Sequence, residues 1–375
     1  MYNNYYSKED HEKTIFIPIA ACKELFLEQT IKSALSLASN PNRLFFGVFN
    51  NILDPENVVY FDSETKFPVK TKKTLSLLSN PFFTKNEQIV YAELVTAVPM
   101  GVGYGRLNAS LLSQKNCDYF FQIDAHTVFS KDWDKIIIEN YNRVLNETNN
   151  NKVILTALPG HSWTYDPKNP EVIYTKSKQL NDELGIEIIN PYNNDYNYIE
   201  AHNGTVETRF DGWQGTVFSE ENVGMPISFG GNGFTGEYYQ ESNAIHASFV
   251  FGKYESIREV MHDPQDIFNG DQTNYTLRIL SRSYKIFSVK RPFLLTLDKY
   301  VKDKNGEVSL LDEENNWRAF SGYSPSAPSE YHNTLQKNSK KRYKEIFSGE
   351  YLGYWGAENM DTLKEAKKKM GFPEL

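Results

Sequence analysis

The sequence predicts an α/β fold with a mostly parallel central sheet. The runs TIFIPIA (Thr14–Ala20) and LFFGVF (Leu44–Phe49) are almost wholly apolar, which is typical of strands buried on both faces. The segment between them has apolar residues at helical spacing, and this alternation of strand and helix is the pattern of βαβ units. No internal repeat or low-complexity linker divides the chain, so one α/β domain with elaborations is expected.

The first part of the chain continues this alternation after its opening unit. That unit consists of the two strands above and a helix predicted at Glu24–Leu37. The later elements are predicted from the same two periodicities. They are a strand at Gln88–Val95, the core of a helix at Asn108–Ser113, a strand at Tyr119–Ile123, a helix at Trp133–Leu145 and a strand at Lys152–Leu158.

The pattern weakens from Pro159 to Gly236, where Asn, Tyr and Gly are frequent, so loops and short antiparallel strands are expected. Lysine clusters near the C-terminus, at Lys340–Lys344 and Lys367–Lys369, are interpreted as solvated helical faces. Regular periodicity returns between these two regions. The elements predicted there are strands at Ala247–Phe251, Lys285–Val289 and Phe293–Leu297 and a helix near Gln272–Ser281.

Composition excludes several classes of protein. The 375 residues carry a formal net charge of -8, and the pI is near 5.5, which gives no electrostatic reason to expect a nucleic acid or an acidic membrane as partner. Cys22 and Cys117 are the two cysteines, too few for a disulfide framework, and they fit a reducing compartment. The sequence shows no secretory signal and no apolar run long enough to span a membrane, so a cytoplasmic location is expected.

The segment FFQIDAHTVFSKDWD (Phe120–Asp134) ends an apolar strand in an acid and an imidazole, Asp124 and His126. Ligands of open α/β sheets bind beyond the carboxyl ends of the strands. Residues i and i+2 of an extended backbone point the same way, so both side chains can reach one ion. A carboxylate with an imidazole suits Mn²⁺ and, less ideally, Mg²⁺. A capping Asp with a surface His is the alternative, and the spacing leaves both open.

Other polar residues allow two interpretations each. The glycines of GVGYGR (Gly101–Arg106) let the backbone approach a phosphate that Arg106 could contact, or they form a turn before a helix on which Arg106 is exposed. Asp271 and Gln272 stand at a helix start, where an acid also satisfies the helix N-terminus. Asp298 ends another apolar strand and is either a site residue or a solvated turn residue, and His246 is a core or a cleft histidine.

Four separated segments, taken in order, resemble the GT-A glycosyltransferases that attach N-acetylglucosamine to hydroxyl groups, typified by the cytoplasmic polypeptide α-N-acetylglucosaminyltransferases. The Q-I-D-x-H sequence followed by a W-D pair is the most specific part of the resemblance. The tail also resembles the closing helices of that family, whereas His161–Ile245 has no counterpart. The four segments are Ile15–Asn51, Gly103–Asp134, Val153–Gly160 and His246–Pro292.

The resemblance implies a GT-A fold in which one domain spans residues 1–375. Residues 14–158 would form the nucleotide-sugar-binding half, residues 159–300 the acceptor and catalytic half, and residues 301–375 a C-terminal helical extension. In that family the D-x-H pair holds a divalent metal that bridges the diphosphate of a sugar nucleotide, which implies this role for Asp124 and His126. Arg106 would then face the diphosphate. The residues implied in uracil recognition are Asn51 and the backbone near Ala20 and Ala21.

This chain departs from the family pattern at two places. The family reads G-E-E at a helix start where this chain has Gly270, Asp271 and Gln272, so one carboxylate is kept for the sugar or the acceptor and the other is lost. The family has a histidine as third metal ligand where this chain has Asp298. An oxygen ligand there is chemically acceptable and favours Mg²⁺ or Mn²⁺ over softer ions.

The resemblance implies a metal-dependent, retaining transfer of a sugar from a UDP-sugar, with UDP-GlcNAc as the leading donor, to a hydroxyl group on a protein. A glycan or the hydroxymethylated bases of viral DNA are alternative acceptors, although the acidic pI disfavours DNA. A non-catalytic nucleotide-sugar-binding protein on a decayed transferase scaffold is the alternative from another class. The segment Trp163–Gly236 is expected to shape the acceptor site, with Trp213 as a stacking platform or a loop anchor.

Overall fold

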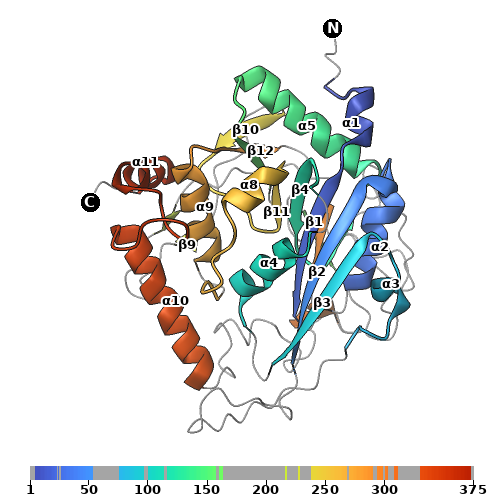
Figure 1. Cartoon of the computed structure of the whole chain (residues 1–375), viewed down its shortest axis with the longest axis horizontal. Coiled ribbons are helices and arrows are strands. Elements are labelled where there is room, and N and C mark those ends of the chain that lie inside the picture. Colours follow the sequence, from blue (N-terminus) through green and yellow to red (C-terminus); the bar gives the residue numbers. More distant parts are fainter. Residues whose placement is uncertain are drawn as a thin grey trace.

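Eight strands form the central sheet of the molecule (Figure 1). They are β1 (Ile15–Cys22), β2 (Leu44–Leu53), β3 (Ile89–Thr96), β4 (Tyr119–Ile123), β6 (Val153–Thr156), β10 (Tyr239–Ser242), β11 (Phe249–Lys253) and β12 (Lys285–Val289). Their order across the sheet is β10-β12-β6-β11-β4-β1-β2-β3. β11 runs antiparallel to both neighbours and β10 antiparallel to β12, whereas the other neighbouring strands are parallel. The predicted α/β fold with a mostly parallel sheet is therefore confirmed.

These features are seen in a computed structural model of the chain. It describes residues 5–22, 24, 27–53, 76–96, 100–113, 116–157, 160–163, 216–217, 227–228, 238–267, 270–289, 294–298, 300–302, 308–310 and 330–372. The predicted acceptor segment falls mostly between these ranges, and Trp213 lies outside the described residues.

Helices cover both faces of the sheet because successive side chains of a buried strand point to opposite faces. On one face, Ile15, Ile17 and Ile19 of β1 pack in one core cluster with α2 (Leu27–Leu37) and α5 (Trp133–Thr148). On the other face, Phe16 and Phe120 join a second cluster with α8 (Tyr254–Glu259) and α9 (Asp271–Ser281). α4 (Val102–Leu111) lies against β1 and β2 on that same second face (Figure 1). Shorter helical turns are α1 (Lys8–Glu12), η1 (Pro41–Arg43) and α3 (Pro81–Thr84).

Two of the predicted boundaries moved for identifiable reasons. The helix predicted around Asn108–Ser113 begins earlier, at Val102, directly after Gly101, whose φ of 94° is not helical. The strand predicted from Ala247 begins at Phe249, because the Phe249 backbone N–H donates to the carbonyl of His246 at 2.9 Å and closes a tight turn there. His246 is half-buried within this turn.

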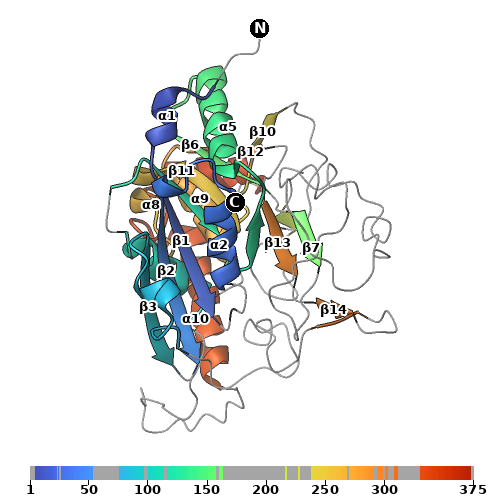
Figure 2. The same ribbon diagram turned by 90° about the vertical axis from the view of Figure 1, so that its right-hand side faces the viewer.

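A small second sheet lies beside the large one (Figure 2). Its strands are β5 (Thr127–Phe129), β13 (Leu294–Asp298) and β7 (Gly160–Trp163), in the order β5-β13-β7. β13 is antiparallel to β5, with Thr296 opposite Thr127, and parallel to β7. Two antiparallel pairs complete the described strands. They are β8 (Thr216–Val217) with β9 (Ile227–Ser228), and β14 (Tyr300–Lys302) with β15 (Val308–Leu310).

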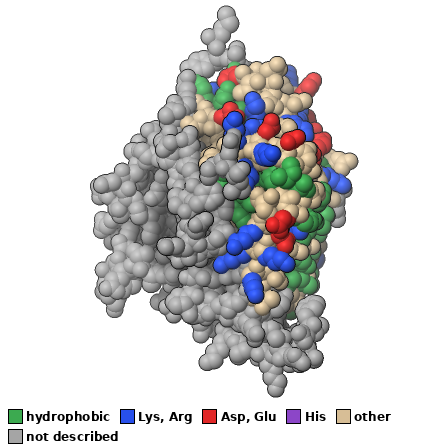
Figure 3. All heavy atoms as spheres, turned by 90° about the vertical axis from the view of Figure 1, so that its left-hand side faces the viewer, with side chains coloured by type: hydrophobic (Ala, Val, Ile, Leu, Met, Phe, Trp, Pro, Cys, Tyr) green, Lys and Arg blue, Asp and Glu red, His purple; other side chains and the backbone are tan. Residues whose placement is uncertain are grey.

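The C-terminal helices α10 (Glu330–Ser348) and α11 (Met360–Met370) pack against the α9 side of the molecule. In α11 the apolar residues Leu363, Ala366 and Met370 are buried, while the lysines 364, 368 and 369 are exposed. Basic and acidic side chains are intermingled on this face of the molecule (Figure 3). The lysine cluster of α11 is thus a solvated helical face. Among the residues that the model describes, no helix combines the length and the apolar character needed to cross a bilayer.

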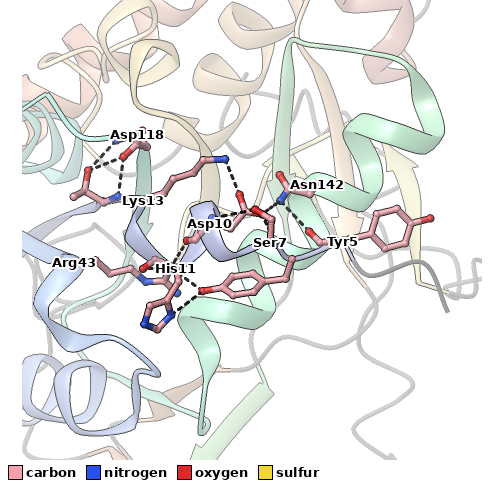
Figure 4. Close-up of polar contacts among 10 residues, drawn as sticks. Tyr5, Ser7, Asp10, His11, Lys13, Arg43, Asp118 and Asn142 are labelled. Carbon is pink, nitrogen blue, oxygen red and sulfur yellow. Dashed lines mark hydrogen bonds and ion pairs between the residues drawn. The ribbon is translucent and has the colours of Figure 1, made fainter.

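A buried ion pair joins η1 to the start of α5. The Arg43 guanidinium donates to the Asp134 carboxylate at 2.6 and 2.9 Å, and both side chains are almost fully buried. The same carboxylate accepts from the backbone of Ser39 at 2.6 Å and of Asn40 at 3.1 Å. Arg43 also donates to the backbone carbonyl of Asp10 at 2.7 Å, and this connects α1 to the same group (Figure 4). The pair therefore connects three chain segments, namely α1, the chain leading into η1, and the start of α5.

Replacing Asp134 with Asn is expected to lower the free energy of unfolding by about 3–5 kcal/mol, because Arg43 is left as a buried, unpaired charge. Urea unfolding at neutral pH, followed by circular dichroism, measures the change. Glu345→Gln is the matched control, since Glu345 pairs with Lys341 at 3.6 Å on the surface of α10 and is expected to change stability by less than about 0.5 kcal/mol. Equal effects of the two substitutions would contradict the role of the buried pair.

Asp10 makes the stability of the N-terminal region depend on pH in the acidic range. Burial alone would raise the pKa of Asp10, but hydrogen bonds from Lys13 at 2.6 Å and from Ser7 at 2.8 Å lower this pKa to about 2 (Figure 4). An unfolded Asp has a pKa of about 3.9. The stabilisation is therefore complete above this value and is lost as the pH falls from about 4 to 2. We expect the difference in unfolding free energy between the wild type and Asp10→Asn to shrink over that interval, and a difference that is constant with pH would refute this.

Candidate active site

The candidate site lies at the carboxyl ends of β1 and β4, where the strand order reverses. The sheet continues from β1 to β2 and β3 on one side, whereas β4 lies on the other side of β1. Crevices at such switch points are the usual ligand sites of open α/β sheets. Asp124 directly follows β4, and Glu24 lies two residues beyond the end of β1. Two acids from separate strands therefore stand at one edge of the sheet.

The D-x-H side chains lie close together and are partly exposed. The Nε2 atom of His126 is 3.9 Å from the Oδ2 atom of Asp124, and the two side chains are 19% and 27% exposed. Two ligands that each lie roughly 2 Å from one ion are separated by at most about 4 Å. The observed separation is within this limit, so the distance is compatible with both side chains binding one divalent cation.

The backbone around His126 is braced by α2. The buried Thr30 hydroxyl donates to the Ala125 carbonyl at 2.9 Å and accepts from the Thr127 N–H at 2.9 Å. One turn later, the Ser33 hydroxyl accepts from the N–H of Phe129 at 3.0 Å. These bonds satisfy backbone groups on both sides of His126, where the chain passes from β4 to β5. The imidazole itself contacts a carboxylate, since its Nδ1 atom lies 2.9 Å from Oε2 of Glu24.

Arg106 bridges two acids of the site. Its Nη1 atom is hydrogen bonded to Asp271, and its Nη2 atom is 3.4 Å from Asp124. The Arg106 and Asp271 side chains are only 11% and 7% exposed. Burial raises the pKa of Asp271 above its usual range, while the Arg106 guanidinium and the backbone N–H of Gln272 oppose part of this rise. Arg106 is thus largely enclosed by the site and is not the exposed residue that follows from the turn interpretation.

The glycines before Arg106 allow the close approach of two chain segments. The Gly103 N–H donates to the carbonyl of Asp266 at 2.8 Å. A Cβ atom at Gly103 would lie 2.1 Å from the carbonyl oxygen of Asp263, a distance that no side chain tolerates. Gly101 adopts a φ of 94° and lies against Ile267 in the same way. The glycines therefore seat the first turn of α4 on residues 263–267, and the structure favours the turn interpretation for them.

The same segment also holds α9. The Asn274 side chain donates to the Asp266 carboxylate at 2.8 Å, and both residues are fully or almost fully buried. Burial and the neighbouring Asp263 raise the pKa of Asp266 well above its usual range. Because α4 and α9 bind one segment, Arg106 on α4 and Asp271 at the start of α9 are brought into contact.

The residues that the resemblance implies for uracil recognition belong to β1 and β2. Asn51 is buried, and its amide donates to the Leu94 carbonyl at 3.2 Å and to the Thr96 hydroxyl at 2.7 Å. Its carbonyl accepts from the Met100 N–H at 2.9 Å. Ala20 packs under α4, since its Cβ would lie 3.1 Å from a Cβ at Gly105, and its neighbour Ala21 is buried. Ala20 thus faces α4 and Asn51 binds Met100 just before α4, whereas Ala21 packs in the core cluster on the other face of the sheet. Contact of these residues with uracil stays a prediction.

For two predicted site residues, Gln272 and Asp298, the structure gives the position in the chain but describes no side-chain contact within the site. Gln272 is the second residue of α9 and is half-buried, and its carbonyl accepts from the Thr276 hydroxyl at 2.7 Å. Asp298 is the last residue of β13, two positions beyond Thr296, which pairs with Thr127. The backbone of Asp298 therefore lies toward the D-x-H segment, but its side chain is outside the described residues. Among the side chains that are described, no group of three His, Cys, Asp or Glu residues surrounds one metal position.

Glu24 and Thr30 are parts of the site that the sequence reasoning missed. The rule that placed Asp124 at the edge of the sheet applies equally to Glu24, because β1 and β4 are adjacent parallel strands. For Thr30 the indication in the sequence was weaker, namely one polar residue among the apolar residues of a buried helix face. Its role depends on the packing of α2 against β5, which the sequence does not specify.

Comparison with known proteins places the chain in a family. The family model described as glycosyltransferase (GlcNAc) matches residues 53–367. No curated protein matches the chain. Among solved structures, the crystal structure of GalNAc-T7 with UDP, GalNAc and Mn²⁺ is similar at 11% identity and a TM-score of 0.48, over 99% of this chain and 59% of that chain. The present chain thus spans less than two thirds of the length of that structure.

The predicted α/β fold and the resemblance to glycosyltransferases are confirmed, while the GT-A class and membership of the cytoplasmic polypeptide group stay predictions. Because the family match covers most of its residues, the chain belongs to the GlcNAc glycosyltransferase family.

Proposed function

We propose that this chain transfers a sugar, with N-acetylglucosamine as the leading candidate, from a UDP-sugar to a hydroxyl group on a protein. We further propose that Asp124 and His126 bind a divalent cation, Mn²⁺ or Mg²⁺, that the reaction requires. Membership of the glycosyltransferase family supports glycosyl transfer. The observation that carries the rest is that one arginine contacts both Asp124 and Asp271 at the switch point of the sheet, where His126 lies beside Asp124.

The charge of the site supports a cation. Asp124, Asp271 and Glu24 are three carboxylates within one connected group, and Arg106 supplies one positive charge against them. A divalent cation offsets the excess negative charge, and the phosphates of a nucleotide in turn offset the cation. When bound, the cation stabilises the negative charge that develops on the leaving UDP. We include Asp298 in the proposal as a further ligand of the cation.

Arg106 and Asp271 have distinct proposed roles. A guanidinium can donate to a carboxylate and a phosphate together, so Arg106 can keep Asp271 in place and contact the diphosphate with its remaining donors. Asp271 begins a helix, and burial raises its pKa, which suits a group that accepts a proton from the acceptor hydroxyl or binds a sugar hydroxyl. Gln272, the next residue of α9, is proposed to contact the sugar or the acceptor beside it.

The donor pocket and the acceptor site are proposed from the family resemblance. Asn51 and the backbone near Ala20 and Ala21 are proposed to contact uracil, because they lie at the carboxyl ends of β1 and β2, and Ala20 packs against the helix that carries Arg106. A protein acceptor, retention of anomeric configuration and a cytoplasmic location follow from the cytoplasmic group that the sequence resembles. Identifying modified proteins by mass spectrometry, with and without the active enzyme, tests the acceptor.

Nucleotide binding is expected to depend on the metal. In isothermal titration calorimetry, UDP should bind at least tenfold more tightly with Mn²⁺ than after chelation with EDTA. Asp124→Asn and His126→Ala should each abolish this gain, because each removes one ligand atom from a pair 3.9 Å apart. Asp132→Asn is the matched control on the same connection, since the Asp132 side chain makes no capping bond and Asn also tolerates its φ of 58°. Metal-independent UDP binding in the wild type would refute the metal site.

Turnover is expected to depend on Asp271 more than nucleotide binding does. Asp271→Asn should lower kcat for UDP release from UDP-GlcNAc by roughly 10²- to 10⁴-fold, the range for loss of a proton-transferring group. UDP affinity with Mn²⁺ should change far less, because Asp124 and His126 remain. Glu255→Gln, an exposed acid on α8, is the control and should leave kcat unchanged. Equal kcat values for the wild type and Asp271→Asn would remove Asp271 from the reaction.

A further inference from the structure

The contact between Glu24 and His126 joins two edges of the site that are 102 residues apart in the chain. We propose that Glu24 is a positioning residue that holds the His126 ring with its proton on Nδ1, so that Nε2 is the atom presented to the cation. The inference rests on the proposed function, since it concerns the same metal site. It adds a residue that lies outside the D-x-H motif and touches neither the cation nor the nucleotide.

The hydrogen bond determines which ring nitrogen has the free electron pair. A carboxylate has no proton to donate, so a bond of 2.9 Å between Oε2 of Glu24 and Nδ1 of His126 requires the proton on Nδ1. In a neutral ring the other nitrogen, Nε2, then carries the electron pair that a metal needs. Nε2 is also the nitrogen that lies 3.9 Å from Asp124. The atom left free by the hydrogen bond is thus the one that faces the second ligand.

The surroundings hold this arrangement in place. The Glu24 side chain is only 4% exposed, and a buried carboxylate is costly unless it is hydrogen bonded, so it has little freedom to leave His126. Thr30 fixes the backbone carbonyl before His126 and the N–H after it. The ring orientation is therefore set from two sides. Histidine ligands of metals commonly donate their other N–H to such a carboxylate, which fixes the tautomer.

The protonation pattern of the ring tests the inference without metal. The measurement is a long-range ¹H–¹⁵N spectrum of the metal-free protein labelled with ¹⁵N-histidine, in which His126→Asn identifies the signals. At a pH at which the ring is neutral, wild-type His126 is expected to carry its proton on Nδ1 and none on Nε2. In Glu24→Gln, whose amide can also donate, the fraction of this tautomer should fall. A neutral wild-type ring protonated on Nε2 would overturn the proposal even if no variant could be purified.

Metal affinity is the second measurement, made by electron paramagnetic resonance with Mn²⁺ in the presence of UDP. Glu24→Gln is expected to weaken Mn²⁺ binding by about 10- to 100-fold, the usual effect of removing the partner of a metal-bound histidine. Glu24→Asp keeps the carboxylate and should restore part of the affinity. Glu28→Gln is the matched control, since Glu28 lies in the first turn of α2, pairs with Lys32 at 2.7 Å and does not contact His126. Circular dichroism confirms that each variant folds.

The outcomes separate the inference from the function beneath it. Tight Mn²⁺ binding by the wild type with equal binding by Glu24→Gln would overturn the role of Glu24 and leave the metal site intact. Absence of Mn²⁺ binding by the wild type would overturn the proposed metal site, and the spectrum of the metal-free ring would still decide whether Glu24 sets the tautomer. Equal weakening by Glu24→Gln and Glu28→Gln would show a general effect on α2 and would also overturn the proposal.

Discussion

The constraint on which this site depends is that charged groups at the end of a buried strand need partners. Asp124 directly follows β4, whose residues are all buried, and its own side chain is only 27% exposed, so a partner is needed to offset the partial loss of water around its charge. Arg106 supplies one partner, and Glu24 engages the neighbouring imidazole of His126. Among the described residues of this group, the carboxylates of Glu24, Asp124 and Asp271 outnumber the Arg106 guanidinium. An excess of carboxylates of this kind favours the binding of a cation.

Close backbone packing determines where the positive charge of the site lies. α4 can reach residues 263–267 only because Gly103 has no Cβ, and Asp266 in that segment also binds α9 through Asn274. Arg106, three residues after Gly103, is thereby placed beside Asp271. The glycines that suggested a phosphate loop thus contribute indirectly, by allowing the helix that carries the arginine to approach the helix that begins with the acid.

Much of this architecture could be predicted because it depends on local patterns. Buried strands such as β4 and amphipathic helices such as α5 are visible as apolar runs and helical spacing, and the strand-end rule identified Asp124 and His126. The contacts of Glu24 and Arg106 depend on which strands are neighbours and on how closely helices pack. Those are properties of the whole sheet, and no window of the sequence contains them. The carboxylate beside His126 was therefore missed, although its own position followed from the same rule.

The site consists of two halves, and different parts of the fold hold each half in place. Glu24, Asp124 and His126 belong to the first third of the chain, and α2 braces them. Asp271 depends instead on the packing of α4, α9 and residues 263–267, which joins segments far apart in sequence. Arg106 connects the halves by binding an acid of each. Changes that loosen α2 should therefore act first on binding of the cation, whereas changes in the 263–267 segment should act first on turnover, and a change at Arg106 should affect both.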